Sequence, residues 1–251
     1  EQKLKKKYSL NNISILVRAI FQTREFEERF LKIGMGYRVI GGTKFYERAE
    51  IKDSVAFLRI VNQKNDDLAF ERIINVPKRA IGDSTVKLLY DWGRKNKKPL
   101  EDSAIDLLQQ NKITPKTKLG LMQILNFFNK WRSDLKEKKH YELMEIILDE
   151  SGYSKMLKDK KDLESEGKLE NLKELIRGMH EFDNLQGFLE HVALATSIDQ
   201  NWDGEKVNLM TMHGAKGLEF DAVFLPGWEE GLFPHQKALE EKGDLALEEE
   251  R

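Results

Sequence analysis

The side chains best suited to chemistry lie in a loop near the carboxyl-terminal end of the chain. The apolar run Val207–Met212 predicts a strand, and HGAKGLEFD follows it before a second apolar run at Ala222–Leu225. In open parallel sheets, ligands bind beyond the carboxyl ends of the strands. The loop residues suited to phosphate and ribose are Thr211, His213, Gly214, Lys216, Gly217 and Glu219.

These residues supply the groups that a nucleotide or a nucleic-acid backbone needs. The two glycines let the main chain approach a ligand closely, the lysine adds a cation, and Glu219 offers an acceptor for a sugar hydroxyl. An ordinary strand-to-helix turn with a solvated lysine fits the same spacing, because short motifs also match by chance. The spacing alone therefore leaves a ligand site and a plain turn open.

Arg18 is the second candidate because it closes another apolar, β-branched run, Ile13–Arg18. It would also stand at a strand end, where a guanidinium can bind phosphate oxygens in a bidentate manner. A surface arginine that pairs with a carboxylate is the alternative.

The third candidate is the segment Asn75–Thr85, NVPKRAIGDST, between two predicted helices. Pro77 and Gly82 would break the helices, and Ser84 or Thr85 would cap the second one, whose free amides can bind an anion. Residues 78–98 carry seven Lys or Arg and two Asp, a local net charge of +5. Duplex DNA bound through its phosphates fits this charge, and so does a solvated basic helix face.

The elements that must position these residues follow from hydrophobic spacing. The first strand, a helix at Thr23–Ile33 stopped by Gly34, and a strand at Tyr37–Ile40 form a βαβ unit. From about Glu47 to Asn201 helical stripes replace strand alternation. The stripes are Ile51, Val55, Leu58 and Val61; Leu121, Ile124, Phe128, Trp131 and Leu135; Leu169, Leu172, Ile176, Met179 and Phe182; and Phe188, Leu189 and Val192.

The simplest packing joins the two β-bearing ends in one mostly parallel sheet. The polar segments Asn111–Thr117 and Lys158–Gly167 would connect helices of the middle part, which is large enough for its own core. The sequence therefore predicts an α/β fold, an incomplete parallel sheet interrupted by a large all-α inserted domain. The expected ranges are 1–46 and 204–251 for the sheet domain and 47–203 for the insertion.

Composition excludes several kinds of site. The 251 residues include 42 Lys or Arg, 43 Asp or Glu and no Cys, so polyanion contacts must come from local patches and thiolate sites are absent. No His spacing suits zinc, no apolar run approaches the ~20 residues of a membrane span, and no signal peptide or GxxxxGK[ST] phosphate loop occurs. We expect the chain to be a piece of a longer protein, because it lacks an initiator Met and stops in a charge run.

Two further expectations concern residues outside these candidates. The acidic pairs Glu27–Glu28 and Asp66–Asp67 are expected to be solvated or capping charges rather than an acid–base pair. The aromatic residues Phe127, Phe128 and Trp131 are expected to lie in a core rather than to form a stacking platform.

Three long stretches resemble the UvrD/PcrA/Rep family of superfamily-one DNA helicases. VNLMTMHGAKGLEFDAVFLPGWEEGLFPH is similar to motif V with its downstream strand. ISILVRAIFQTREFEERFLKIGMGYRVIGGTKFYERAEIKD resembles the part of the second RecA-like motor domain that precedes an inserted domain, and DDLAFERIINVPKRAIGDST resembles the start of that insertion. The resemblance covers essentially the whole chain, with weaker likeness at LDESGYSKML and KLENLKEL.

This resemblance implies a motor that uses ATP with Mg²⁺ to move three-prime to five-prime on single-stranded DNA, in repair or replication. Two RecA-like domains would close on ATP, and the first, which would hold most of the ATP and magnesium, is not in this sequence. Partners would be single-stranded DNA, duplex DNA and that first domain of the same parent chain, with no membrane. The protein would be cytoplasmic and nucleoid-associated.

Matching residues carry the family's roles as follows. Arg18 resembles the arginine that reaches the γ-phosphate, where it would stabilise charge on the transferred phosphoryl group, so it is the catalytic candidate. Val17, Gly217 and Glu219 match ATP-binding positions. Thr211 and His213 match positions that bind the single strand, and Lys216 lies beside them. Arg79, Gly82 and Thr85 match positions that bind the duplex, and Lys78 lies beside them.

The chain departs from the family at three places. A Tyr that stacks on adenine usually precedes the arginine, but here Val17 does, which offers only a smaller apolar contact. The family's Gly-Ile-Gly is here Ala80-Ile81-Gly82, which matters if position 80 needs a positive φ. The chain also stops at Glu248–Arg251, where a last motif with a second phosphate-contacting arginine would begin.

The sequence therefore predicts the second RecA-like motor domain, with its inserted domain, of an ATP-dependent DNA helicase. Because it carries no phosphate loop, we expect this chain alone not to hydrolyse ATP. The alternatives are a non-catalytic duplex-DNA-binding adaptor and part of a helicase–nuclease fusion of the same superfamily.

Overall fold

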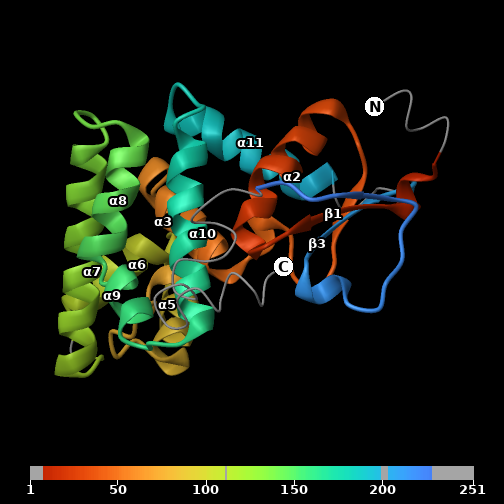
Figure 1. Cartoon of the computed structure of the whole chain (residues 1–251). Coiled ribbons are helices and arrows are strands. Elements are labelled where there is room, and N and C mark those ends of the chain that lie inside the picture. The colour runs from red at the N-terminus through yellow and green to blue at the C-terminus, as the bar shows by residue number, and fades with distance from the viewer. Residues whose placement is uncertain (1–7, 111, 199–202, 228–251) are drawn as a thin grey trace. The chain divides into compact units, whose positions relative to one another are not determined.

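The computed structural model describes residues 8–110, 112–198 and 203–227 (Figure 1). The chain divides into two compact units. Unit 1 comprises residues 1–47 and 197–251, and unit 2 comprises residues 48–196. Each unit is described by itself below.

Unit 1 is built on a four-stranded sheet in which every pairing is parallel. Its strands are β1 (Ile13–Val17), β2 (Tyr37–Val39), β3 (Val207–Thr211) and β4 (Ala222–Phe224), in the order β2-β3-β1-β4. The two ends of the sequence therefore share one parallel sheet, and the predicted α/β fold is confirmed. Figure 1 shows β1 and β3 side by side.

The helix that follows β1, α2, has the bounds that its sequence predicts, Thr23–Ile33. Gly34 ends it with a φ of 63°, a left-handed conformation that glycine adopts without strain. Phe30 of α2 is buried with Ile15, Tyr37 and Leu209 in the core of the unit. Apolar residues of both sequence segments thus hold the sheet and its helix together.

The expectation that Glu27 and Glu28 are solvated is wrong, because both side chains are buried. Glu27 accepts a hydrogen bond from the Phe45 amide at 2.9 Å, and Glu28 accepts one from the Tyr46 hydroxyl. These bonds compensate for the lost hydration of two carboxylates. They fasten α2 to the 3-10 turn Phe45–Glu47.

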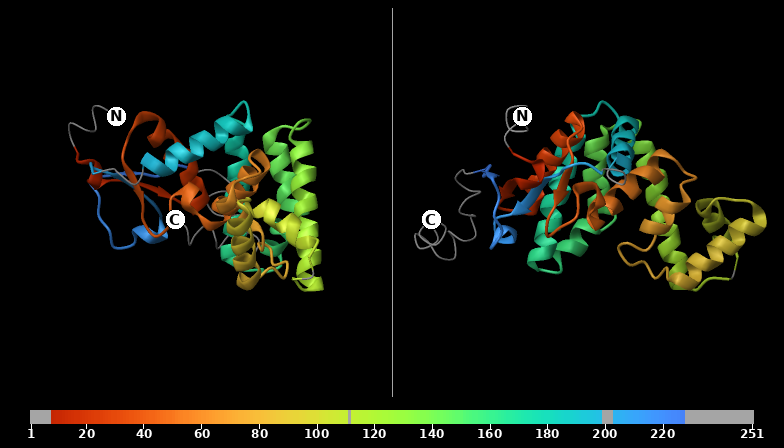
Figure 2. Two further views of the ribbon diagram at one scale, coloured as in Figure 1. Left: turned by 180° about the vertical axis from the view of Figure 1, so that it is seen from behind. Right: turned by 90° about the vertical axis from the view of Figure 1, so that its right-hand side faces the viewer.

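Unit 2 contains helices and no strand within its described residues. Its stripes of apolar residues are largely buried: Ile51 and Leu58 of α3 and Phe128 and Trp131 of α7 are inaccessible to solvent. Phe128 and Trp131 are therefore core, as expected, whereas Phe127 is only partly buried and stacks on Trp131. Figures 1 and 2 show these helices, whose bounds are α3 Ala49–Asn62, α4 Asp67–Ile73, α5 Asp83–Asn96, α6 Leu100–Leu108, α7 Pro115–Asp134, α8 His140–Glu150, α9 Tyr153–Lys158, α10 Leu163–Met179 and α11 Leu185–Ile198.

The two predicted polar connectors are shorter than expected, because capping residues begin a helix inside each of them. The Thr114 side chain accepts from the Thr117 amide at 3.2 Å and starts α7. The Asp162 side chain accepts from the Ser165 amide at 2.6 Å and starts α10. Asp66 caps α4 in the same way, which confirms a capping role for that acid.

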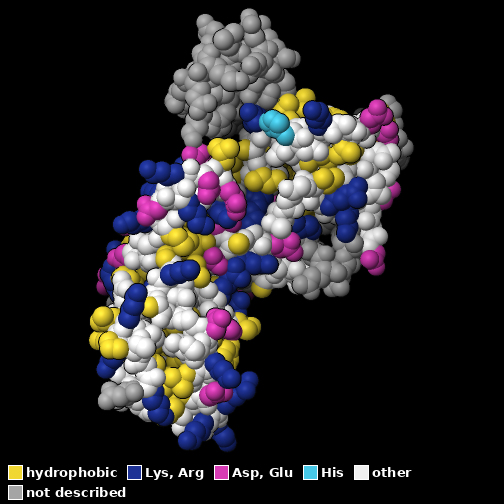
Figure 3. Space-filling model, turned by 90° about the horizontal axis from the view of Figure 1, so that it is seen from below, with side chains coloured by type: hydrophobic (Ala, Val, Ile, Leu, Met, Phe, Trp, Pro, Cys, Tyr) yellow, Lys and Arg dark blue, Asp and Glu magenta, His cyan; other side chains and the backbone are white. Residues whose placement is uncertain are grey.

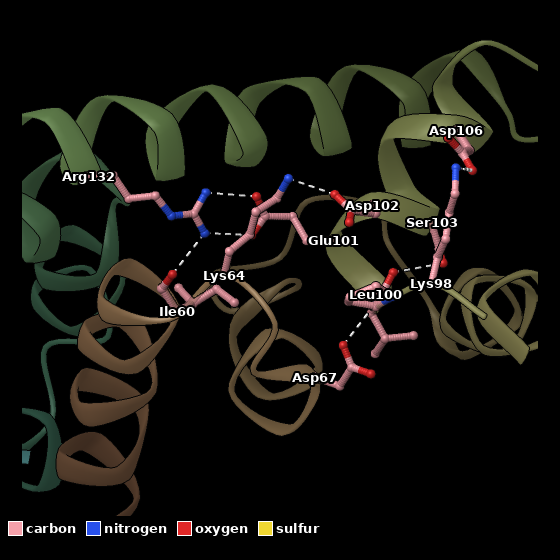
Figure 4. A network of polar contacts seen from close by, with 11 residues as sticks. Ile60, Lys64, Asp67, Lys98, Leu100, Glu101, Asp102, Ser103, Asp106 and Arg132 are labelled. Atoms are coloured by element: carbon pink, nitrogen blue, oxygen red, sulfur yellow. Dashed lines mark hydrogen bonds and ion pairs between the residues drawn. The ribbon is translucent and has the colours of Figure 1, made fainter. Parts of the chain in front are cut away.

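A buried ion pair joins three helices of unit 2 (Figure 4). Arg132 of α7 donates to both carboxylate oxygens of Glu101 of α6, at 2.7 and 2.6 Å, and to the Ile60 carbonyl of α3 at 2.8 Å. The Glu101 side chain is 2% exposed and that of Arg132 is 20% exposed. The guanidinium therefore fixes the relative positions of α3, α6 and α7.

Across the residues that the structure describes, no helix combines the length and the apolar character needed to cross a membrane.

Candidate functional site

The carboxyl ends of β1 and β3 form one edge at which separately predicted residues meet. The strands are parallel neighbours, and Val17 lies opposite Thr211. The Met212 amide donates to the Val17 carbonyl at 2.9 Å, so the chain leaves β1 through Arg18 beside the point where it leaves β3. Arg18 and Thr211, both half-buried, therefore lie at the same end of the sheet.

The chain that leaves β3 forms a 3-10 turn at His213–Ala215 rather than the start of an α-helix. The Ala215 amide donates to the Met212 carbonyl at 3.2 Å. The Thr211 hydroxyl accepts from the Gly214 amide at 3.2 Å, which leaves the hydroxyl hydrogen available to a ligand oxygen. Hydrogen bonds within the turn thus hold its conformation without a ligand.

The polar side chains of this turn face solvent. His213, Lys216 and Glu219 are all exposed, and Gly217 has a φ of 82°, a conformation that favours glycine. An imidazole, an ammonium group and a carboxylate thus follow one another along an exposed main chain. This donor set suits a phosphorylated sugar.

Val17 offers almost no surface to a ligand. It is the last residue of β1, and its side chain is only 1% exposed. Val17 therefore exposes no group that could make the adenine contact implied by the resemblance.

In unit 2, the predicted duplex-binding segment forms a loop between α4 and α5 (residues 74–82, the α4–α5 loop). The Asn75 side-chain carbonyl accepts from the amides of Arg79 and Ile81, at 2.7 and 3.2 Å. The Thr117 hydroxyl of α7 donates to the Ala80 carbonyl at 2.9 Å. The side chains of Asn75 and Thr117 thus fix the conformation of the α4–α5 loop.

The Arg79 guanidinium is turned toward the protein. It donates to the carbonyls of Pro77 and Ser151, both at 3.0 Å. Burial lowers the pKa of Arg79 to about 10, so the group stays charged at neutral pH. Arg79 ties the loop to the end of α8. Within the α4–α5 loop the exposed positions are those of Lys78, Ala80 and Gly82, and Asp83 and Ser84 at the start of α5 are exposed too.

The expected cap at Ser84 or Thr85 is wrong. Gly82 is the N-cap of α5, and its carbonyl accepts from the Thr85 amide at 2.9 Å. The Thr85 side chain is buried, so it also supports the loop rather than lining the surface.

Acidic residues of neighbouring helices bind polar groups of α5 and of the turn that follows it. Lys98 pairs with Asp106 at 2.7 Å, and the Trp92 indole donates to the same carboxylate at 3.1 Å. These hydrogen bonds lower the pKa of Asp106. The Tyr90 hydroxyl donates to Glu71 at 2.6 Å, which raises the pKa of Tyr90 to about 12. The Lys98–Asp106 pair therefore neutralises one of the positive charges counted along the sequence.

Sequence reasoning missed the contribution of α7 to this surface. A Cβ on Gly120 would lie 2.1 Å from the Arg79 carbonyl oxygen, so only glycine lets α7 approach the loop this closely. On either side of Thr117, the side chains of Lys116 and Lys118 are exposed. A glycine inside a helical stripe is the signal that could have indicated the contact. On the face shown in Figure 3, Lys and Arg side chains are spread over the described surface, and several of them lie at the bottom of the view.

Ala80 has a left-handed backbone with a φ of 59°, which costs an L-residue roughly 1–2 kcal/mol. We expect Ala80→Gly to raise the free energy of unfolding by about 0.5–1 kcal/mol, since glycine removes the strain but loses more backbone freedom. Urea unfolding followed by circular dichroism measures this. Ala193→Gly, at an exposed position inside α11, is the control and should lower stability. An Ala80→Gly protein no more stable than the original would show that the strain is absent.

Known proteins resemble this chain over nearly all of its length. The UvrD-like helicase C-terminal domain family matches residues 1–251. A probable DNA helicase II homolog of Rickettsia felis is 43% identical over 248 residues, covering 98% of this chain and 38% of the relative. The ATP-dependent DNA helicase PcrA of Staphylococcus aureus (strain MRSA252) is 39% identical over 257 residues, covering 98% of this chain and 34% of the relative.

The chain thus spans little more than a third of the length of these relatives. The similarity extends over both units, the sheet with its polar carboxyl edge and the helical unit with the α4–α5 loop. The chain belongs to the UvrD-like helicase C-terminal domain family.

Proposed function

We propose that this chain is the second RecA-like motor domain, with its inserted domain, of an ATP-dependent DNA helicase that moves three-prime to five-prime. The assigned ranges are 1–46 and 204–251 for the motor domain and 47–203 for the insertion. The observation that carries the proposal is the shared edge of β1 and β3, where Arg18 and the loop after Thr211 lie at one end of a parallel sheet.

The nucleotide half of the proposal rests on the Arg18 guanidinium and on the exposed side chains of the turn after β3. Arg18 would stabilise charge on the γ-phosphate, and Gly217 and Glu219 would lie near phosphate and ribose. No group of three or more His, Asp or Glu among the described residues is placed to hold a metal ion. As the resemblance implies, Mg²⁺ would be held mainly by the first motor domain, where it would neutralise phosphate charge.

The single-strand half of the proposal rests on Thr211, His213 and Lys216. A hydroxyl with a free hydrogen and exposed basic groups can bind the phosphates of a strand without reading its bases. Because Arg18 leaves β1 beside this turn, a strand phosphate is the second candidate ligand for Arg18.

Catalysis in the parent protein would need both motor domains. We expect the parent to hydrolyse ATP faster with DNA present and this chain alone to show no turnover with DNA and Mg-ATP. Robust turnover by the isolated chain would contradict the assignment, and a parent without DNA-stimulated turnover would favour a duplex-binding adaptor.

Duplex DNA would contact unit 2 at the α4–α5 loop through Lys78, the Gly82 main chain and the adjoining Lys116. Arg79 and Thr85 would act indirectly by fixing the loop. This division of roles follows from the exposed ammonium groups and the buried guanidinium contacts.

We expect Lys78→Glu together with Lys116→Glu to weaken duplex binding by about ten-fold or more and to reduce the salt slope by about 2, because each phosphate contact contributes ~0.9. Fluorescence anisotropy of a labelled duplex over a salt series measures both quantities. The control is Lys136→Glu with Lys138→Glu, two exposed lysines beyond the other end of α7. Equal effects of the two pairs would contradict a local contact.

A further inference from the structure

One carboxylate of α3, that of Asp53, binds side chains from two elements that flank the α4–α5 loop. Its Oδ1 atom accepts from the Arg72 guanidinium at 2.8 Å, and its Oδ2 atom accepts from the Tyr153 hydroxyl at 2.7 Å. Hydrogen bonds to an ionised carboxylate are among the stronger ones in proteins. None of the roles proposed above uses these three residues.

Arg72 fixes the point at which the chain enters the α4–α5 loop. It lies in the last turn of α4, directly before the loop, and it also donates to the Ala49 carbonyl of α3 at 3.2 Å. The Asp53 side chain is 14% exposed, so solvent screens its pair with Arg72 only in part. These contacts attach the start of the loop to the first two turns of α3.

Tyr153 fixes a second support of the loop, the turn between α8 and α9 (residues 151–152, the α8–α9 turn). Tyr153 is the first residue of α9 and is buried, and its amide donates to the Ser151 hydroxyl at 3.3 Å. The Ser151 carbonyl in turn accepts from the Arg79 guanidinium at 3.0 Å. The residue bound to Asp53 therefore adjoins the turn that binds the arginine of the loop.

Packing supports the same arrangement. A Cβ on Gly152 would be in van der Waals contact with the Pro77 Cγ atom, at 4.0 Å, so the main chain of the α8–α9 turn lies beside the loop. The Tyr153 ring meets the Phe57 ring of α3 edge-on, with centroids 6.3 Å apart. Burial, together with the Asp53 carboxylate, raises the pKa of Tyr153, so its hydroxyl keeps the hydrogen that it donates. Ring and hydroxyl thus both anchor the start of α9 to α3.

We propose that Asp53 is a positioning residue for duplex DNA. Through Arg72 it holds the start of the α4–α5 loop, and through Tyr153 it holds the turn whose carbonyl binds Arg79. The proposal rests on the duplex contact proposed above, in which Lys78 reaches phosphates from the exposed part of the same loop. A carboxylate repels phosphate, so Asp53 acts on binding by placing the loop and not by touching the DNA.

The test measures the binding of a labelled duplex by fluorescence anisotropy for Asp53→Ala and Tyr153→Phe, the second of which keeps the ring and removes only the hydroxyl. Each variant should weaken duplex binding by about 2- to 30-fold, the range for substitutions that act on a ligand through packed contacts. The salt slope should fall by about 1, because a displaced loop loses a phosphate contact. A smaller folded fraction would instead lower the amount of protein that binds and leave the slope unchanged.

A second substitution shows whether Tyr153 acts through the loop. Arg79→Ala removes the side chain that joins the α4–α5 loop to the α8–α9 turn, so adding Tyr153→Phe to it should weaken duplex binding little further. Residues of one contact network give such non-additive effects, whereas the effects of independent residues add. The control is Tyr46→Phe, which removes a hydroxyl–carboxylate hydrogen bond from unit 1 and should leave duplex affinity unchanged.

Unchanged duplex affinity in Tyr153→Phe would overturn the positioning role, and so would full addition of its loss to that of Arg79→Ala or an equal loss in Tyr46→Phe. Failure of the proposed duplex contact is a separate result, because the unmodified protein would then bind no duplex or would bind it independently of Lys78 and Lys116. Binding through these lysines with an ineffective Tyr153→Phe contradicts only the inference about Asp53.

Discussion

Replacing Arg18 by alanine in the parent protein is expected to lower ATP turnover at saturating ATP by about 10³-fold or more, the range found for arginines that stabilise a transferred phosphoryl group. The KM for ATP should change by no more than a few-fold, because the charge that this arginine would stabilise develops in the transition state. Steady-state kinetics at saturating DNA separate the two constants. The reason for choosing Arg18 is its place at the carboxyl end of β1, beside the turn that follows β3.

Two further variants make this result specific. Arg18→Lys keeps the charge but removes the planar fork, so it should recover only part of the turnover. Arg29→Ala removes an exposed arginine from α2 of the same unit and should leave turnover unchanged. If saturated turnover survives in Arg18→Ala while more DNA is needed for activation, Arg18 binds the strand together with Thr211 and His213. Equal losses in turnover and ATP affinity would reject the catalytic role.

Arg132→Ala is expected to lower the free energy of unfolding by about 3–5 kcal/mol, because it leaves the buried Glu101 carboxylate without its counter-charge. The substitution also removes a donor from the Ile60 carbonyl. The ion pair joins α6 and α7 of unit 2, so the loss should appear in the helical signal during urea unfolding (Figure 4).

The matched control is Lys173→Ala, which breaks an ion pair with Glu170 on the surface of α10. Exposed pairs contribute about 0–1 kcal/mol, so this change should be small. Arg132→Met combined with Glu101→Met removes both charges and should recover most of the stability lost in Arg132→Ala. If Arg132→Ala costs no more than Lys173→Ala, the buried pair does not organise the unit.

The parts of the fold that the sequence predicted best are those set by local rules. The bounds of α2 follow from a regular apolar stripe and from Gly34, which the main chain needs in a left-handed conformation. The strands of the sheet are apolar runs, and each ends within a residue of the predicted position. That the sheet joins the two ends of the chain followed from the absence of strands between them.

The features that the sequence could not predict depend on interaction partners that are distant along the chain. Glu27 is buried because the Phe45 amide is available to it. Arg79 is turned inward because Pro77 and Ser151 present carbonyl groups. The sequence of a basic segment does not show whether a charged side chain points to solvent or donates to a buried carbonyl group. The same limit applies to the proposed nucleotide site, where the edge was predictable and the burial of Val17 was not.

The strand order β2-β3-β1-β4 also determines when this sheet can form during synthesis. Strands from the early segment, β1 and β2, alternate with strands from the late segment, β3 and β4. Neither segment contains two strands that pair with each other, so none of the described sheet pairings can exist until the ribosome has passed residue 207. At 5–20 residues per second the wait after β2 is roughly 10–30 s. During that interval the whole of unit 2 emerges and can complete its own core. The edges of β1 and β2 stay unpaired in the same interval, so they must be covered or slow to pair if they are not to associate with another chain.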